Sequence, residues 1–113
     1  MPAYAIAHLQ EAAPHPDLAE YLERVTGTFV PFGGRFLVHA AQHEVMEGDW
    51  PGGVVVIGFP SMTEARDWWD SPAYRAIVPL RSRHIRGDII LVPGVADDYD
   101  PTATASALRE ASR

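Results

Sequence analysis

The chain has 113 residues, of which 47% are hydrophobic and 21% charged, and this length allows one globular domain with a core of its own. Its formal net charge of −6 argues against a nucleic-acid partner, and the absence of cysteine excludes disulfides, thiolate metal sites and a cysteine nucleophile. No segment is apolar over the roughly 18 residues of a membrane-spanning helix, and the N-terminus lacks the pattern of a signal peptide, so we expect a cytoplasmic protein without membrane contact.

The first forty residues predict a strand, a helix and a second strand. Residues 3–10 are apolar and rich in β-formers, and the prolines that follow end the strand. A stripe of apolar residues at three- and four-residue spacing then predicts a helix: Leu18, Tyr21, Leu22, Val25 and Phe29. Residues 35–42 predict the second strand, with Arg35, Leu37 and His39 on one face and Phe36, Val38 and Ala40 on the other.

The rest of the chain predicts a hairpin partner, a broken helix and a last strand. Residues 54–59 are a continuous apolar run, as in a strand buried on both faces, and a glycine-rich loop joins them to the second strand. Ser61 and Glu64 match a capping box, and Ser71-Pro72 match a second helix start, so the second helix is expected in two pieces, with Pro79 as a kink or restart. Residues 88–93 form the last strand.

This order predicts an α+β, ferredoxin-like βαββαβ fold with a four-stranded antiparallel sheet. We expect this domain to span residues 1–95 and to be followed by an acidic, mobile tail over 96–113, in which a short helix from Thr102 to Arg109 is an option. With helices on one face, the sheet leaves an apolar face bare. The simplest cover is a second copy related by a two-fold axis, so we expect a homodimer.

Five ordered segments carry a resemblance to a known family. They are Gly33-Gly34-Arg35-Phe36-Leu37-Val38, Glu47-Gly48-Asp49-Trp50, Phe59-Pro60-Ser61, Asp70-Ser71-Pro72-Ala73-Tyr74 and Pro79-Leu80-Arg81. In order and spacing they resemble the domain of unknown function 1330 family, over about residues 3 to 95. The resemblance implies the dimeric α+β barrel superfamily, which includes cofactor-free monooxygenases, polyketide cyclases, muconolactone isomerases and haem-degrading enzymes. His39 departs from the pattern, because relatives often place an arginine there.

Arg35 and His39 are the first candidates for a functional site. Arg35 follows two glycines, where backbone can approach a ligand closely, and a guanidinium there suits a two-pronged clamp on a carboxylate; the alternative is an ion pair at the surface or between subunits. His39, predicted on the same face, is suited to proton transfer near neutral pH; the alternative is a polar histidine at the dimer interface.

Tyr4 and His8 share one face of the first strand and form a second pair of candidate proton-transfer groups, with a core or interface role as the alternative. No metal site is expected. Four strand residues separate His39 from His43 by about 13 Å, whereas two ligand nitrogens must each lie about 2 Å from one ion. The absence of lysine excludes Schiff-base catalysis, and no phosphate-binding loop is present, so we expect no cofactor.

Aromatic residues and one further arginine are the candidate substrate-binding groups: Trp50, Trp69, Tyr74 and Arg81. Trp68 and its neighbour Trp69 point about 100° apart on a helix, so only one of them can pack on the sheet. Trp50 lies in a loop, where an aromatic suits a lid or a dimer contact. For all of these residues, packing in the core or at an interface is the alternative.

Three hypotheses of function follow, the last of which is a haem or metal protein. The first is a small-molecule enzyme or binding protein, with cofactor-free proton-transfer, isomerase, cyclase or monooxygenase chemistry on a small anionic or aromatic substrate. The second is a non-catalytic dimeric interaction or sensing module, whose polar residues are structural. A ligand-sized cavity lined by Arg35 and an aromatic residue would favour the first.

Overall fold

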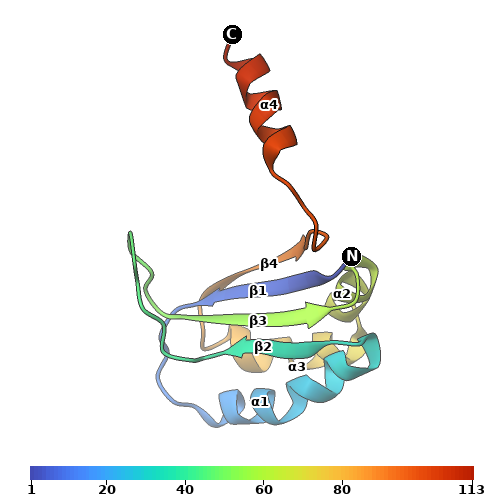
Figure 1. Cartoon of the computed structure of the whole chain (residues 1–113). Helices are drawn as coiled ribbons and strands as arrows, with labels where there is room; N and C mark the ends of the chain where they lie inside the picture. Colours follow the sequence, from blue (N-terminus) through green and yellow to red (C-terminus); the bar gives the residue numbers. More distant parts are fainter.

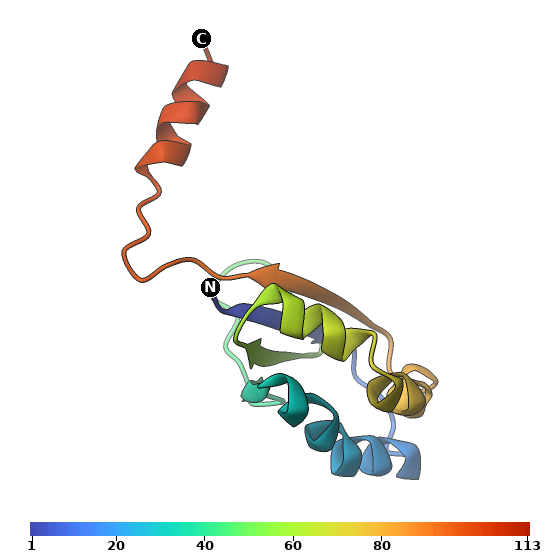
Figure 2. The same cartoon turned by 90° about the vertical axis from the view of Figure 1, so that its right-hand side faces the viewer.

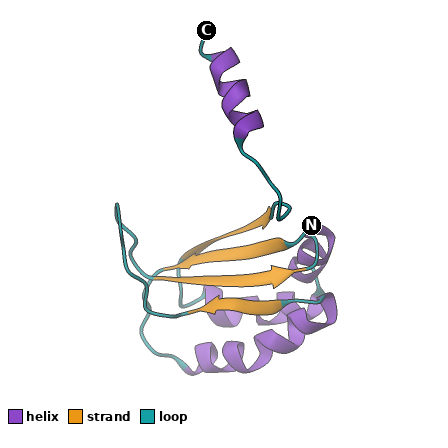
Figure 3. Cartoon of the chain, viewed as in Figure 1, coloured by secondary structure: helices purple, strands orange, loops and turns teal.

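The computed structural model describes all of residues 1–113 and has a four-stranded antiparallel sheet in the order β2-β3-β1-β4. Helices cover one face of this sheet, and the other face is bare (Figures 1, 2 and 3). In chain order the elements are β1 (Ala3–Leu9), α1 (Pro16–Phe29), the 3₁₀ turn η1 (Val30–Phe32), β2 (Arg35–His39), β3 (Gly53–Phe59), α2 (Met62–Trp69), α3 (Pro72–Ser82), β4 (Gly87–Pro93) and α4 (Thr102–Ala111). The predicted α+β, ferredoxin-like fold is confirmed.

The helices α2 and α3 are joined by Asp70 and Ser71. Ser71 caps α3, since its Oγ accepts a hydrogen bond from the Tyr74 amide at 3.3 Å. The capping box expected at α2 does not form, because the Ser61 hydroxyl donates to the Glu64 carboxylate and neither side chain binds a backbone amide. The helix α3 also continues through Pro79 instead of restarting there.

Trp68 is the centre of the core between sheet and helices. It is 2% exposed, and its ring lies 5.3 Å from that of Phe59 and 4.2 Å from that of Tyr74. Its indole N–H donates to Thr28 Oγ1 at 3.0 Å, which satisfies the one polar atom that burial would leave unpaired. Trp68 therefore joins α1, α2, α3 and β3.

Gly34 allows β2 to start against this core. A Cβ at this position would lie 2.9 Å from Phe29 Cβ and 2.8 Å from Phe59 Cε1, closer than side-chain carbons approach. The close approach that the Gly33-Gly34 pair was expected to offer a ligand is thus occupied by two phenylalanines of the core. The glycines next to Arg35 have a packing role.

The start of α1 is tied to the segment after α3. His15 caps α1, with its Nδ1 accepting the amide of Asp17 at 3.0 Å, and His84 Nε2 lies 2.9 Å from the Asp17 carboxylate. The rings of His15 and His84 are stacked, with centroids 3.8 Å apart. The hydrogen bond from His84 holds the pKa of Asp17 below its ordinary value of 3.8.

This lowered pKa predicts an acid-dependent part of the stability. Because the carboxyl is more acidic in the folded state than in the unfolded state, ionised Asp17 stabilises the fold above the ordinary pKa, and this stabilisation is lost as the pH falls through the lower folded-state value. We therefore expect Asp17→Asn to flatten the decline of Tm in acid. Asp67→Asn, at an exposed carboxylate, is the control. Equal acid slopes in wild type and Asp17→Asn would contradict the assignment.

The bare face of the sheet is apolar at its centre. The strand register places one residue from each strand in a row across it: Val38, Val56, Ile6 and Ile90. Val38 and Ile90 are 36% and 56% exposed, and Leu37 beside them is 42% exposed. A contiguous row of branched side chains that is exposed at both ends is typical of a surface that packs against a partner.

Beyond β4 the chain leaves the body of the molecule. The helix α4 points away from the sheet and from the other helices (Figures 1 and 2), and all its side chains are exposed. A helix is therefore present in the segment expected to be a tail. Each helix of the structure is too short or too polar to cross a membrane.

Candidate functional site

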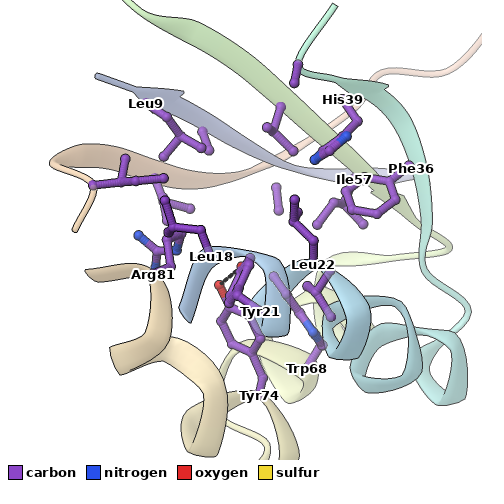
Figure 4. A pocket seen from close by; sticks show the side chains of 17 residues that line it. Leu9, Leu18, Tyr21, Leu22, Phe36, His39, Ile57, Trp68, Tyr74 and Arg81 are labelled. Atoms are coloured by element: carbon purple, nitrogen blue, oxygen red, sulfur yellow. Dashed lines mark hydrogen bonds between the residues drawn. The ribbon is translucent and has the colours of Figure 1, made fainter. Parts of the chain in front are cut away.

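A cavity of about 240 Å³ lies between the helix-covered face of the sheet and the helices α1 and α3 (Figure 4). Its lining is almost wholly apolar, and only a few side chains bring polar atoms to it: Tyr21, His39, Tyr74, Arg81 and the indole of Trp68. Ligand sites of proteins have this character, with an apolar wall and few, converging polar groups.

The cavity has two causes in the sequence. The central strand β1 turns Ala5 and Ala7 toward the helices, and these side chains are too short to fill the space beneath the sheet. The second cause is the uneven packing of α1. Its C-terminal half packs tightly, with Val25 and Phe29 each 1% exposed, whereas Leu22, one turn earlier, lines the cavity and is 49% exposed. The cavity therefore opens beside the first half of α1.

Two tyrosines meet in the cavity wall. The hydroxyls of Tyr21 on α1 and Tyr74 on α3 are 3.0 Å apart and share a hydrogen bond. Burial raises the pKa of the Tyr21 phenol above its ordinary value, and the neighbouring Tyr74 adds to this, while Arg81 opposes it. Tyr21 is therefore protonated throughout the neutral range. One hydroxyl proton serves the bond between the tyrosines, so the other is free for a ligand.

Arg81, in the last turn of α3, is a buried cation without an acidic partner. It is 7% exposed, its Nε is buried without a hydrogen-bond partner, and it forms no ion pair. The carbon of its guanidinium lies 5.7 Å from the centre of the Tyr21 ring. An arginine this deeply buried is rare unless it is paired.

His39 reaches the cavity because of a β-bulge. The pairing of β2 with β3 shifts between Phe36 and Val38, so that Val38 pairs with Val56 and His39 with Val55. A bulge residue reverses the alternation beyond it. His39 thus shares the helix-covered face with Phe36, whose ring lies 4.8 Å from the imidazole. The predicted common face of Arg35, Leu37 and His39 is wrong: Arg35 and His39 lie on opposite faces of the sheet.

Arg35 and Tyr4 instead line a hollow of about 300 Å³ on the bare face, beside Leu37 and Gly58. This hollow is more open and more polar than the cavity. Arg35 is exposed and forms no ion pair within the chain. Arg35 therefore lines an open hollow together with Tyr4 and does not line the cavity, and the hollow lies on the face where a second copy is expected to pack.

His8 and Trp50 lie together on the same bare face. Their rings are stacked with centroids 4.4 Å apart, and His8 Nε2 is 2.5 Å from the carbonyl oxygen of Pro51. Both contacts hold the β2–β3 loop against β1. The three residues predicted to transfer protons are therefore not brought together, since His8 and Tyr4 lie on the face opposite His39.

Among the predicted substrate-binding residues, Tyr74 and Arg81 line the cavity, and Trp50 and Trp69 do not. The Trp69 ring lies beside that of Tyr74 and stacks against Arg75, whose guanidinium carbon is 4.4 Å from the indole centre. Its neighbour Trp68 is the tryptophan that reaches the cavity.

Tyr21 is the site residue that sequence reasoning missed, because it was assigned to the apolar stripe of α1. A usable signal was present: a tyrosine on a buried helix face needs a partner for its hydroxyl.

The family model described as "Domain of unknown function (DUF1330)" matches residues 2–95. The chain belongs to this family. No curated protein matches it. The DUF1330 chain is similar in structure to a protein of unknown function from Rhodopseudomonas palustris, at 19% identity and a TM-score of 0.63, over 84% of this chain and 83% of that one.

Two further solved structures share the fold of this DUF1330 protein. SnoaB, a cofactor-independent oxygenase from Streptomyces nogalater, has 11% identity and a TM-score of 0.60, over 88% of this chain and 98% of that one. A dimeric ferredoxin-like protein of unknown function from Jannaschia sp. CCS1 has 8% identity and a TM-score of 0.63, over 83% and 100%. At such low identities, structural similarity shows only that the fold is shared, and the function must be argued from the residues of the site.

Proposed function

We propose that this DUF1330 protein binds a small, largely apolar molecule, aromatic or anionic, in the cavity beneath its sheet. One observation carries the proposal: an open, apolar cavity of about 240 Å³ into which a few polar side chains converge from β2, α1 and α3. A core with no ligand to hold would be packed to the density of an organic crystal. A dry engineered cavity of about 150 Å³ already binds benzene, so this one has room for a molecule of one or two rings.

The protein would act as a homodimer whose two sheets pack face to face. The row of branched residues across the bare face, with half-buried Val56 and Ile6 at its centre and exposed residues at its ends, supports this arrangement. Two apolar sheet faces that pack together remove this row from water. The Jannaschia neighbour, described as dimeric, has the same fold. The hollow around Arg35 would then lie at the seam between the subunits.

Cofactor-free proton transfer is the chemistry that fits the cavity best. The His39 imidazole lies at its edge, is exposed, and forms no hydrogen bond within the protein. It would take a proton from a bound molecule and return it at another position, as an isomerase or cyclase does. SnoaB, a cofactor-independent oxygenase, shows that the shared fold can house chemistry without a cofactor. A purely structural dimeric module would leave the cavity without a ligand.

The proposal predicts that filling the cavity weakens binding. Ala7→Leu places three extra carbons beneath β1. We therefore expect it to weaken binding of two probes, 1-naphthoate and 1-naphthamide, by at least about tenfold. Because it fills a cavity, it should also raise the free energy of unfolding by about 0.5–2 kcal/mol. Thermal shift measures both effects, because a ligand at about 100 times its Kd adds about 2.7 kcal/mol.

The matched control is Ala76→Leu, the same change at an exposed position of α3. It should leave both thermal shifts unchanged. Binding of either probe by Ala7→Leu with wild-type affinity would place the ligand elsewhere. Absence of any shift in the wild type would favour the non-catalytic module.

A further inference from the structure

The charge of Arg81 bears on which ligand the cavity takes. The Arg81 side chain is 7% exposed, no carboxylate pairs with its guanidinium, and its Nε is buried without a hydrogen-bond partner. The C-terminal end of α3 and the face of the Tyr21 ring both favour a cation. Neither replaces a counterion, because an isolated buried charge is among the costliest groups in a folded protein.

The other polar groups near Arg81 are donors as well. The Tyr21–Tyr74 pair holds one hydroxyl proton that no protein acceptor takes. No aspartate or glutamate lines the cavity. Donors that converge on one place, without an anionic group among them, are complementary to a negatively charged oxygen.

The apolar remainder of the cavity determines what kind of carbon skeleton the ligand has. Apolar side chains surround the space between Arg81 and His39, which Figure 4 shows on opposite sides of the cavity. A ligand that fills this space has its charge at one end and its carbon skeleton in the middle. Its far end then meets the imidazole.

We propose that the ligand is an organic monoanion, a carboxylate or enolate on an aromatic or alicyclic body, whose charged oxygen binds Arg81 and the Tyr21–Tyr74 pair. This rests on the proposed function of the cavity and assigns its anion subsite to Arg81, not to Arg35. Arg35 faces the opposite side of the sheet and has no access to this space.

Isothermal titration calorimetry with 1-naphthoate and its neutral amide, 1-naphthamide, separates charge recognition from cavity binding. In the wild type at neutral pH, we expect the carboxylate to bind at least about tenfold more tightly than the amide, since hydrogen bonds to a charged group are the strong ones. Arg81→Met should abolish this preference and leave the amide affinity within about threefold. Arg35→Met, the matched control, should keep the preference.

The thermal stability of the ligand-free Arg81→Met variant is a second test, because a ligand-binding role and a structural role of Arg81 predict opposite changes in it. Removing an unpaired buried charge should leave the Tm of the ligand-free protein unchanged or raised in Arg81→Met, whereas removing one partner of a structural pair lowers it. If Arg81→Met does not fold, Tyr21→Phe tests the same subsite, because it removes one hydroxyl and should weaken carboxylate binding several-fold more than amide binding.

The outcomes separate the two proposals. Equal affinities of wild type for carboxylate and amide would overturn the anion subsite and leave the cavity as a ligand site. Binding of neither probe would overturn both. A carboxylate preference that Arg35→Met abolishes and Arg81→Met retains would move the subsite to the bare face of the sheet.

Discussion

Val56→Arg should convert the proposed homodimer into a monomer. Val56 pairs with Ile6 and Val38 in the middle of the bare face, so a two-fold interface would bury two arginines at its centre. Each buried unpaired charge costs several kcal/mol, which corresponds to a loss of dimer affinity of at least about a hundredfold. Sedimentation or light scattering at micromolar concentration measures the change.

The control for this substitution is Ala19→Arg, which adds the same charge on an exposed position of α1. It should leave the dimer intact. Far-UV circular dichroism should show both variants folded, because Val56 faces away from the core cluster of sheet and helices. A wild type that sediments as a monomer, or a Val56→Arg variant that stays dimeric, would show that the bare face is not the interface.

Trp68→Ala should lower the free energy of unfolding by about 3–5 kcal/mol, the range for truncating a large buried aromatic. Trp68 is 2% exposed and contacts Phe29, Phe59 and Tyr74. The truncation also enlarges the cavity that Trp68 lines. The loss is a large fraction of the total stability of about 5–15 kcal/mol that small domains have. Urea denaturation followed by circular dichroism gives the value.

Two further variants show how much of this loss of stability comes from the buried position of Trp68 and how much from its hydrogen bond. Trp50→Ala removes the same side chain from an exposed loop, where Trp50 is 42% exposed, and should cost much less. Thr28→Ala removes only the acceptor of the Trp68 indole N–H, and we expect a loss of about 1–3 kcal/mol for the unsatisfied donor. Equal losses in Trp50→Ala and Trp68→Ala would contradict the central place of Trp68 in the core.

The fold could be predicted from the sequence because its signals are local. The helical stripe from Leu18 to Phe29, the apolar run of residues 54–59 and the Ser71-Pro72 helix start each depend on neighbouring residues, and each reappears as an element of the structure. The capping box of α2 shows the limit of such motifs. Ser61 and Glu64 have the right spacing, but their side chains bind each other and not the backbone.

The candidate site could be predicted only in part. Tyr74 and Arg81 were among the predicted substrate-binding residues, and both line the cavity. The position of His39 depended on a bulge at Leu37, which no alternation pattern reveals, and one extra residue in a strand moves every later side chain to the other face. Tyr21 was masked by its apolar neighbours.

The sequence by itself determined the order of the elements, the family, and the need for a cover over the second face of the sheet, because these follow from periodicity, motif spacing and burial of apolar residues. Tertiary structure alone decided where the cavity lies and which polar groups meet in it. Tyr21, Tyr74 and Arg81 come from two helices, and His39 comes from a strand beyond a bulge. Their convergence is a property of packing, since these residues are far apart in the sequence and meet only where the helices cover the alanines of β1.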